Sequence, residues 1–212
     1  MIITKPKPFE KILEMTEPFK KVLIVGCGTC ATEVQTGGDK QVKEMAEKLK
    51  GKVAGTVVVE SPCDLRIDRR DLKGSKKLVD ESDAVLALCC GAGAQTLMDY
   101  TGKIIIPGLD TFFIGKIERI GNYYERCRAC TDCILFETGG ICPIARCAKG
   151  LLNGPCGGQA DGKCEVGDYT RDCAWVLAYN ALKDQKRLDL FTQFRPPRDR
   201  SVKAQPQEIV TK

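Results

Sequence analysis

Histidine is absent from this chain of 212 residues. Its absence excludes a histidine general base, a serine–histidine–aspartate triad and a zinc centre with histidine ligands. The sequence also lacks an apolar run near the roughly eighteen residues that cross a membrane, and the segment from Met1 to Pro8 has no apolar core of a secretory signal. We therefore expect a cytoplasmic protein without a membrane span.

Aromatic residues are scarce, at 6% of the chain, and the net charge is a mild +5. Lysine and arginine are scattered among acidic residues, and few aromatic side chains lie between them. Proteins that bind single-stranded nucleic acid combine basic surfaces with aromatic stacking platforms. We interpret the basic runs as solvated surfaces and expect no nucleic-acid partner.

Cysteine, in contrast, is abundant and occurs thirteen times. A reducing compartment disfavours structural disulfides, and an odd number of cysteines cannot all pair within one chain. Thiolates are also the preferred ligands of iron–sulfur clusters and of structural zinc. The composition therefore predicts that cysteines bind metal here.

Short β-branched runs in the first half of the chain alternate with helical patterns. The runs predict strands over residues 21–26, 55–60, 83–88 and 104–107, and the helical patterns cover 41–50 and 75–81. Strands that alternate with helices are typical of βαβ units. We expect an α/β domain over residues 18–120, built on a small doubly wound parallel sheet.

Five cysteines follow the predicted strands. Cys27 and Cys30 come after the first strand, Cys63 after the second, and Cys89 and Cys90 after the third. The carboxyl ends of parallel strands share one edge of the sheet, beside the crevice where ligands bind, so this pattern predicts a metal site. The alternative is that they are small buried apolar residues. Neighbours on a strand face opposite sides, so only one of Cys89 and Cys90 is expected to bind the metal.

A nucleotide site is a competing interpretation of the same loop. The stretch that begins with Gly26 and Gly28 matches the G-x-G-x-x-G/A dinucleotide pattern, and Glu60 ends the second strand where a ribose-binding acid would lie. The pattern should open directly into a helix, whereas residues 36–39 intervene before the helical pattern starts. An isolated chain that takes electrons from NADH would favour this alternative.

The remaining eight cysteines lie in a loop-rich domain predicted over residues 121–195, where strands give way to glycine-rich loops. Cys127, Cys130 and Cys133 form a C-x₂-C-x₂-C run, which allows three thiolates to wrap one cuboidal cluster as in bacterial ferredoxins. Eight residues separate Cys133 from the next cysteine, Cys142, whereas three separate them in the ferredoxin pattern. A proline follows Cys142, as in that pattern. The other candidate ligands are Cys142, Cys147, Cys156, Cys164 and Cys173.

Eight thiolates make two sites with four ligands each, and zinc competes for one of them because Zn²⁺ also accepts four cysteines. Structural zinc sites more often use paired cysteine knuckles separated by a long spacer, so the triple run favours iron and sulfide. A helix is expected from Trp175 through Phe194, and residues 196–212 are expected to form a mobile tail.

The stretch from Cys142 to Gly158, followed by Gly162 to Val166, resembles the signature of the methylenetetrahydrofolate reductase C-terminal domain family. The Gly-Cys-Gly-Thr-Cys loop that begins at Gly26 and the Cys-Cys-Gly turn at Cys89 fit the same family. That family includes the small iron–sulfur subunit of the acetogen-type reductase.

The resemblance implies a division of labour between subunits. A partner subunit with a TIM barrel carries the flavin and the folate site, and further redox subunits can join the complex. This chain would then hold two to three [4Fe–4S] clusters, or one zinc ion in place of a cluster, and would relay electrons to the flavin without catalytic residues of its own. The alternative from a different class is a zinc-containing structural or adaptor subunit.

Overall fold

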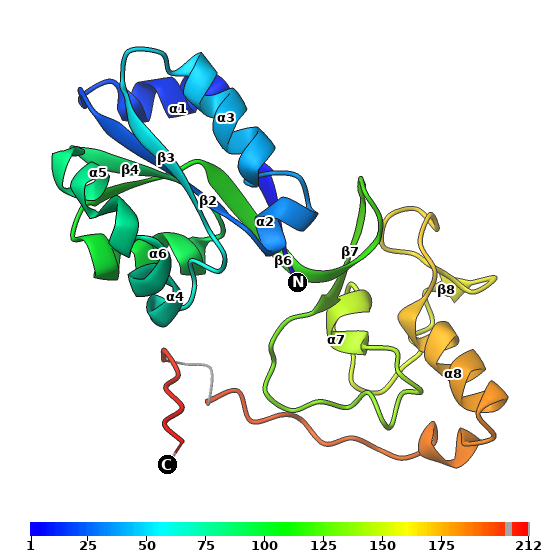
Figure 1. The fold of residues 1–212 in the computed structure, drawn as a ribbon. Coiled ribbons are helices and arrows are strands. Elements are labelled where there is room, and N and C mark those ends of the chain that lie inside the picture. Colours follow the sequence, from blue (N-terminus) through cyan, green and yellow to red (C-terminus); the bar gives the residue numbers. More distant parts are fainter. Residues whose placement is uncertain (202–204, 212) are drawn as a thin grey trace. The chain divides into compact units, whose positions relative to one another are not determined.

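The computed structural model describes residues 1–201 and 205–211 of the chain. The chain forms two compact units, Met1–Tyr124 and Glu125–Lys212, which are called unit 1 and unit 2 below. Figure 1 shows that the parallel strands and most of the helices belong to unit 1, whereas unit 2 consists mostly of loops beside the helix α8.

Unit 1 is built on a parallel sheet of four strands in the order β3-β2-β4-β5. Every residue of β2 and of β4 is buried. Strands covered on both faces are recognised by continuous apolar runs, which is why the sequence predicted them well. The mixed α/β class with a parallel sheet is confirmed. The strand bounds are β2 (Val22–Cys27), β3 (Val53–Val59), β4 (Ala84–Leu88) and β5 (Ile104–Pro107).

Helices cover both faces of this sheet. In Figure 1, α1 and α3 lie on one side of the strands, and α4, α5 and α6 lie on the other. None of the helices in the described part of the chain has the length and apolar character needed to cross a membrane. The helix bounds are α1 (Phe9–Thr16), α2 (Cys30–Glu33), α3 (Asp39–Lys48), α4 (Leu65–Asp71), the 3₁₀ turn η1 (Lys73–Ser75), α5 (Lys76–Glu81) and α6 (Gly91–Thr101).

A second sheet went unpredicted. Strands β1 (Ile2–Pro6), β6 (Leu109–Arg119) and β7 (Asn122–Cys127) form a sheet in the order β1-β6-β7, with β1 antiparallel to β6. Most of their residues are exposed or half-buried, so they lack the continuous apolar pattern that identifies a buried strand. The expectation that strands end at about residue 121 was wrong, because β7 continues to Cys127.

The strand order places a switch point between β2 and β4. The chain first adds β3 on one side of β2 and then crosses over to add β4 on the other side. In open parallel sheets, ligands bind in the crevice outside the carboxyl ends of the strands at such a point. Cys27 ends β2 and Cys89 follows β4 directly, so two of the predicted ligands flank this crevice.

Unit 2 has little regular structure. Its elements are α7 (Pro143–Arg146), β8 (Gln159–Ala160), β9 (Lys163–Cys164), α8 (Ala174–Asp184) and the 3₁₀ turn η2 (Leu188–Leu190). Its small core centres on Trp175, which is 1% exposed and meets the ring of Phe191 edge to face. The final helix ends earlier than expected, because Lys186 adopts a left-handed backbone conformation with a φ of 58°.

The close approach of Gly154 to Trp175 predicts a stability effect. A Cβ atom at Gly154 would lie 2.3 Å from Cδ1 of Trp175. We expect Gly154→Ala to destabilise unit 2 by about 1–3 kcal/mol, as overpacked cores do. Urea unfolding followed by the fluorescence of the single tryptophan measures this directly. Gly157→Ala is the matched control, because a Cβ there meets nothing within 4 Å. Equal midpoints for the two variants would contradict the prediction.

Candidate metal-binding cysteines

Four of the five cysteines predicted to meet at the sheet edge of unit 1 lie in one neighbourhood. Cys89 is 2% exposed. Burial raises the pKa of its thiol, and the charges of Cys90, Cys27, Asp68 and Cys63 add to that effect in this order. These groups act on Cys89 because they surround it. The loops after β2, β3 and β4 therefore converge as the parallel sheet requires.

Cys89 and Cys90 differ in environment, as expected for neighbours on a strand. Cys89 packs in the apolar core, whereas Cys90 is half-buried and precedes the first residue of α6. A Cβ atom at Gly93 would lie 3.0 Å from the Cys89 sulfur and 3.1 Å from Pro62, so only glycine leaves that thiol its space. Cys30, also half-buried, begins α2. Which of these thiols bind metal stays a prediction.

Asp68 is a buried carboxyl group in this neighbourhood that the sequence analysis missed. It has no exposed surface, and neither of its carboxyl oxygens has a hydrogen-bond partner in the described structure. Its pKa is raised to about 7, mainly by burial and to a smaller extent by the nearby charges of Asp64 and Asp71. A usable signal was present, because Asp68 lies one helical turn before the buried Leu72 and so on the inward face of α4.

The glycines of the dinucleotide pattern have packing roles. A Cβ atom at Gly26 would lie 2.5 Å from a methyl group of Val42 and 2.6 Å from the Gly37 carbonyl oxygen. The backbone N–H of Gly28 donates to the carbonyl of Val59 at 2.8 Å. The carboxylate of Glu60 pairs with Arg70 on α4. These contacts account for the two glycines and for Glu60 without a bound nucleotide. The nucleotide site stays an untested prediction.

In unit 2, the C-x₂-C-x₂-C run forms a tightly curled loop that starts at the end of β7. Ala129 and Thr131 both adopt left-handed backbone conformations, with φ values of 47° and 70°. For a β-branched residue such as threonine this conformation is strained, and strained loops cluster at functional sites. The backbone N–H of Ala129 donates to the sulfur of Cys127 at 3.3 Å. The curl turns this backbone donor toward sulfur, and metal binding by the loop stays a prediction.

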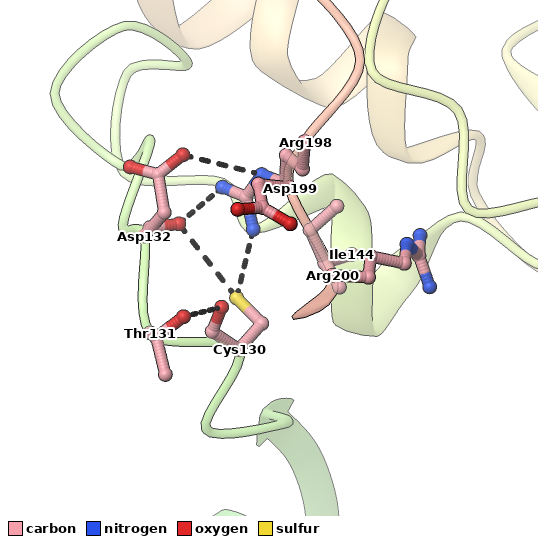
Figure 2. A pocket seen from close by; sticks show the side chains of 7 residues that line it. All are labelled: Cys130, Thr131, Asp132, Ile144, Arg198, Asp199 and Arg200. Atoms are coloured by element: carbon pink, nitrogen blue, oxygen red, sulfur yellow. Dashed lines mark hydrogen bonds and ion pairs between the residues drawn. The ribbon is translucent and has the colours of Figure 1, made fainter. Parts of the chain in front are cut away.

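A pocket of about 310 Å³ opens beside this loop. Figure 2 shows that Arg198 reaches the loop from the C-terminal segment and contacts both Cys130 and Asp132. Whether residues 196–212 are mobile stays a prediction, and residues 202–204 and 212 lie outside the described chain. The pocket is lined by Cys130, Thr131, Asp132, Ile144, Arg198, Asp199 and Arg200.

Four other cysteines of unit 2 line one small cavity of about 20 Å³. They are Cys147, Cys156, Cys164 and Cys173, which come from the end of α7, a loop, β9 and the start of α8. The sequence left the grouping of the eight cysteines open, and this cavity brings half of them together.

A lysine accompanies this second group. The ammonium group of Lys149 lies 3.7 Å from the sulfur of Cys156 and forms an ion pair with Glu165. The hydrogen bond that Lys149 donates to the carboxylate of Glu165 is the main reason that the pKa of Lys149 is raised, so this side chain stays cationic beside the cysteines. Gly158 is needed here, because a Cβ atom would lie 2.0 Å from the Glu165 carboxylate.

The donor chemistry of both groups suits thiolate-bound metals. The described residues nevertheless contain no trio of cysteine or carboxylate side chains arranged to hold a single metal ion. A cluster of four irons and four sulfides needs ligands spread around a larger body than one ion does. The structure thus brings cysteines into the same neighbourhood, but within the described chain it does not place three of them around one ion.

The family of the C-terminal segment follows from a comparison with known families. Residues 106–201 match the family model described as methylene-tetrahydrofolate reductase C terminal. This segment belongs to that family. It contains all eight cysteines of unit 2, whereas the five cysteines of unit 1 lie before it. No curated protein and no solved structure matches the chain.

The environment of Asp68 predicts how stability depends on pH. Because its pKa is about 7 in the folded chain and 3.8 ordinarily, the folded state binds the extra proton between these values. Stability therefore falls as pH rises through this window and levels off above it. We expect Asp68→Asn to remove this loss, so that the variant gains about 1–3 kcal/mol over the wild type between pH 5 and pH 8.

Urea unfolding of both proteins at the two pH values measures the effect. Asp80→Asn on the exposed face of α5 is the matched control and should follow the wild type. A difference between Asp68→Asn and the wild type that is the same at pH 5 and pH 8 would rule out an ionised, unpaired carboxylate.

Proposed function

We propose that this chain is the iron–sulfur electron-transfer subunit of a methylenetetrahydrofolate reductase complex. The observation that carries the proposal is the gathering of Cys147, Cys156, Cys164 and Cys173 around one cavity, within a segment that belongs to the reductase family. The curled C-x₂-C-x₂-C loop in the same segment supports it independently.

The grouping of the cysteines supports a proposal for which of them share a site. The cavity takes four of the eight cysteines of unit 2, which leaves Cys142 as the fourth ligand beside the triple run. In unit 1, the candidates are the thiols around Cys89, with Cys30 adjacent in sequence to that rim. Bound iron–sulfur clusters would supply one-electron carriers at these sites. The protein contributes thiolates, burial and nearby charges.

The carbon chemistry belongs to the proposed partner, a TIM-barrel subunit that holds the flavin and the folate. Reduction of methylenetetrahydrofolate to methyltetrahydrofolate consumes two electrons and two protons. This chain has no histidine to serve as an acid or base. Its role in the proposal is to deliver the electrons to the flavin, with further redox subunits as donors.

A zinc-containing structural or adaptor subunit is the second candidate, and one observation favours it. The cavity among Cys147, Cys156, Cys164 and Cys173 has a volume of about 20 Å³, which is close to the space of one water molecule. Four thiolates around a single small ion are typical of structural zinc. A cluster at this place requires the surrounding loops to move apart, and a zinc ion requires a smaller rearrangement, because no trio of side chains in the described residues is placed to hold one ion.

Metal analysis of the full chain, purified without oxygen, separates the two candidates. We expect about eight to twelve irons per chain with matching sulfide, as two to three cubane clusters require, and a visible absorption that bleaches with dithionite. Zinc with little iron and no bleaching would contradict electron transfer.

Single substitutions then assign the sites. Cys130→Ala and Cys156→Ala should each remove about four irons, because each breaks a different group of four thiolates. Thr131→Ala is the matched control, since it changes the triple-cysteine loop without removing a sulfur. Loss of one zinc instead of iron in Cys156→Ala would assign the cavity to zinc and leave electron transfer to the remaining sites.

A further inference from the structure

The contact between Arg198 and Cys130 joins residues 68 positions apart in the chain. A guanidinium nitrogen of Arg198 donates to the sulfur of Cys130 at 3.0 Å. A second nitrogen donates to the carbonyl oxygen of Asp132, and a third lies 3.5 Å from its carboxylate. The side chain of Arg198 is only 10% exposed. Figure 2 shows the guanidinium group held between the two residues.

The segment that carries Arg198 is anchored three residues earlier. Arg195 is 6% exposed, and its backbone N–H and carbonyl form a reciprocal pair of hydrogen bonds with the side chain of Asn153, at 2.8 and 2.7 Å. Its guanidinium donates to the carboxylate and the carbonyl of Glu137, at 2.8 and 2.9 Å, and also lies over the ring of Trp175. This anchor ties the segment to the core of unit 2.

The anchor distinguishes Arg198 from an ordinary surface arginine. A long exposed side chain loses conformational entropy when it forms an ion pair, which is why most surface pairs contribute little. The backbone that carries Arg198 is already held in place by Arg195, so Arg198 loses less conformational entropy when it forms its contacts. Its charge is also largely shielded from solvent. Solvent and salt therefore screen its interaction with sulfur less than they screen an exposed charge.

A fixed cation beside a ligand sulfur has a defined electrostatic effect. Adding an electron to a thiolate-bound group increases its negative charge, so a nearby cation stabilises the reduced state. Hydrogen bonds to sulfur and nearby charge are recognised controls of reduction potential. The comparable cation of the second group, Lys149, lies farther from its sulfur at 3.7 Å, and its side chain is 42% exposed.

We propose that Arg198 is a positioning residue of the site formed by the C-x₂-C-x₂-C run, and that its fixed positive charge raises the reduction potential of the group bound there. This inference rests on the proposed function, because it requires a redox group at Cys130. It adds a role for the C-terminal segment, in which the anchor at Arg195 serves to hold a cation against a metal ligand.

The experiment is a redox titration of the full chain, purified without oxygen and followed by electron paramagnetic resonance. The signal to follow is the one that Cys130→Ala removes. We expect Arg198→Gln to lower its midpoint potential by about 59 mV, which is a tenfold change in the ratio of oxidised to reduced protein for one electron. Arg198→Lys keeps the charge, so its midpoint potential should lie close to that of the wild type. Arg200 lines the same pocket but is exposed, so Arg200→Ala should shift the potential less than Arg198→Gln does.

The outcomes separate this inference from the proposed function. A wild-type chain without iron contradicts the function itself. A wild-type chain with iron, whose potential is the same in Arg198→Gln, overturns only the role of Arg198. Should Arg198→Gln lose its iron, Asp132→Asn provides the test, because removal of the neutralising carboxylate must then raise the potential. The absence of such a rise would overturn the inference.

Discussion

Parallel pairing of β2 with both β3 and β4 is the constraint on which unit 1 depends. It brings the carboxyl ends of three strands to one edge and sends the chain across the sheet between them. The apolar residues of β2 and β4 stabilise this arrangement by burial on both faces. Cysteines after separate strands then become neighbours without any sequence proximity. The same constraint buries Cys89 and Asp68, whose environments disfavour their charged forms.

Unit 2 relies on a different principle. Its apolar core is small and centres on Trp175, and long loops surround it. Small units with so little buried apolar surface commonly gain stability from bound metal. Cys173 is part of this core, and Cys147 packs against it. If unit 2 binds metal as proposed, metal binding and folding are expected to be coupled in this part of the chain.

The charges around the three groups of cysteines differ in sign. In unit 2, Arg198 contacts the triple run and Lys149 contacts the second group, and each cation is paired with a carboxylate. In unit 1, the buried neighbour is the acidic Asp68. Cations favour reduction of a bound group and a carboxylate opposes it. If all three groups hold clusters, their potentials should therefore differ, which is the property that gives an electron relay a direction.

The sequence by itself determined the four parallel strands, the helices α3 and α5, and the family of the C-terminal segment. Continuous apolar runs and a long specific motif are local signals that need no partner for their interpretation. Helix α4 was missed, because a short stretch of alternating aspartate and arginine resembles a loop until its inward residues are covered.

Only the tertiary structure decided which cysteines of unit 2 share a cavity, that Asp68 is buried without a partner, and that Arg198 contacts Cys130. Each of these facts joins residues distant in sequence through packing of loops and turns. The sequence carries no local trace of the shared cavity or of the contact between Arg198 and Cys130, because the free energy of such contacts arises only when the separate segments meet.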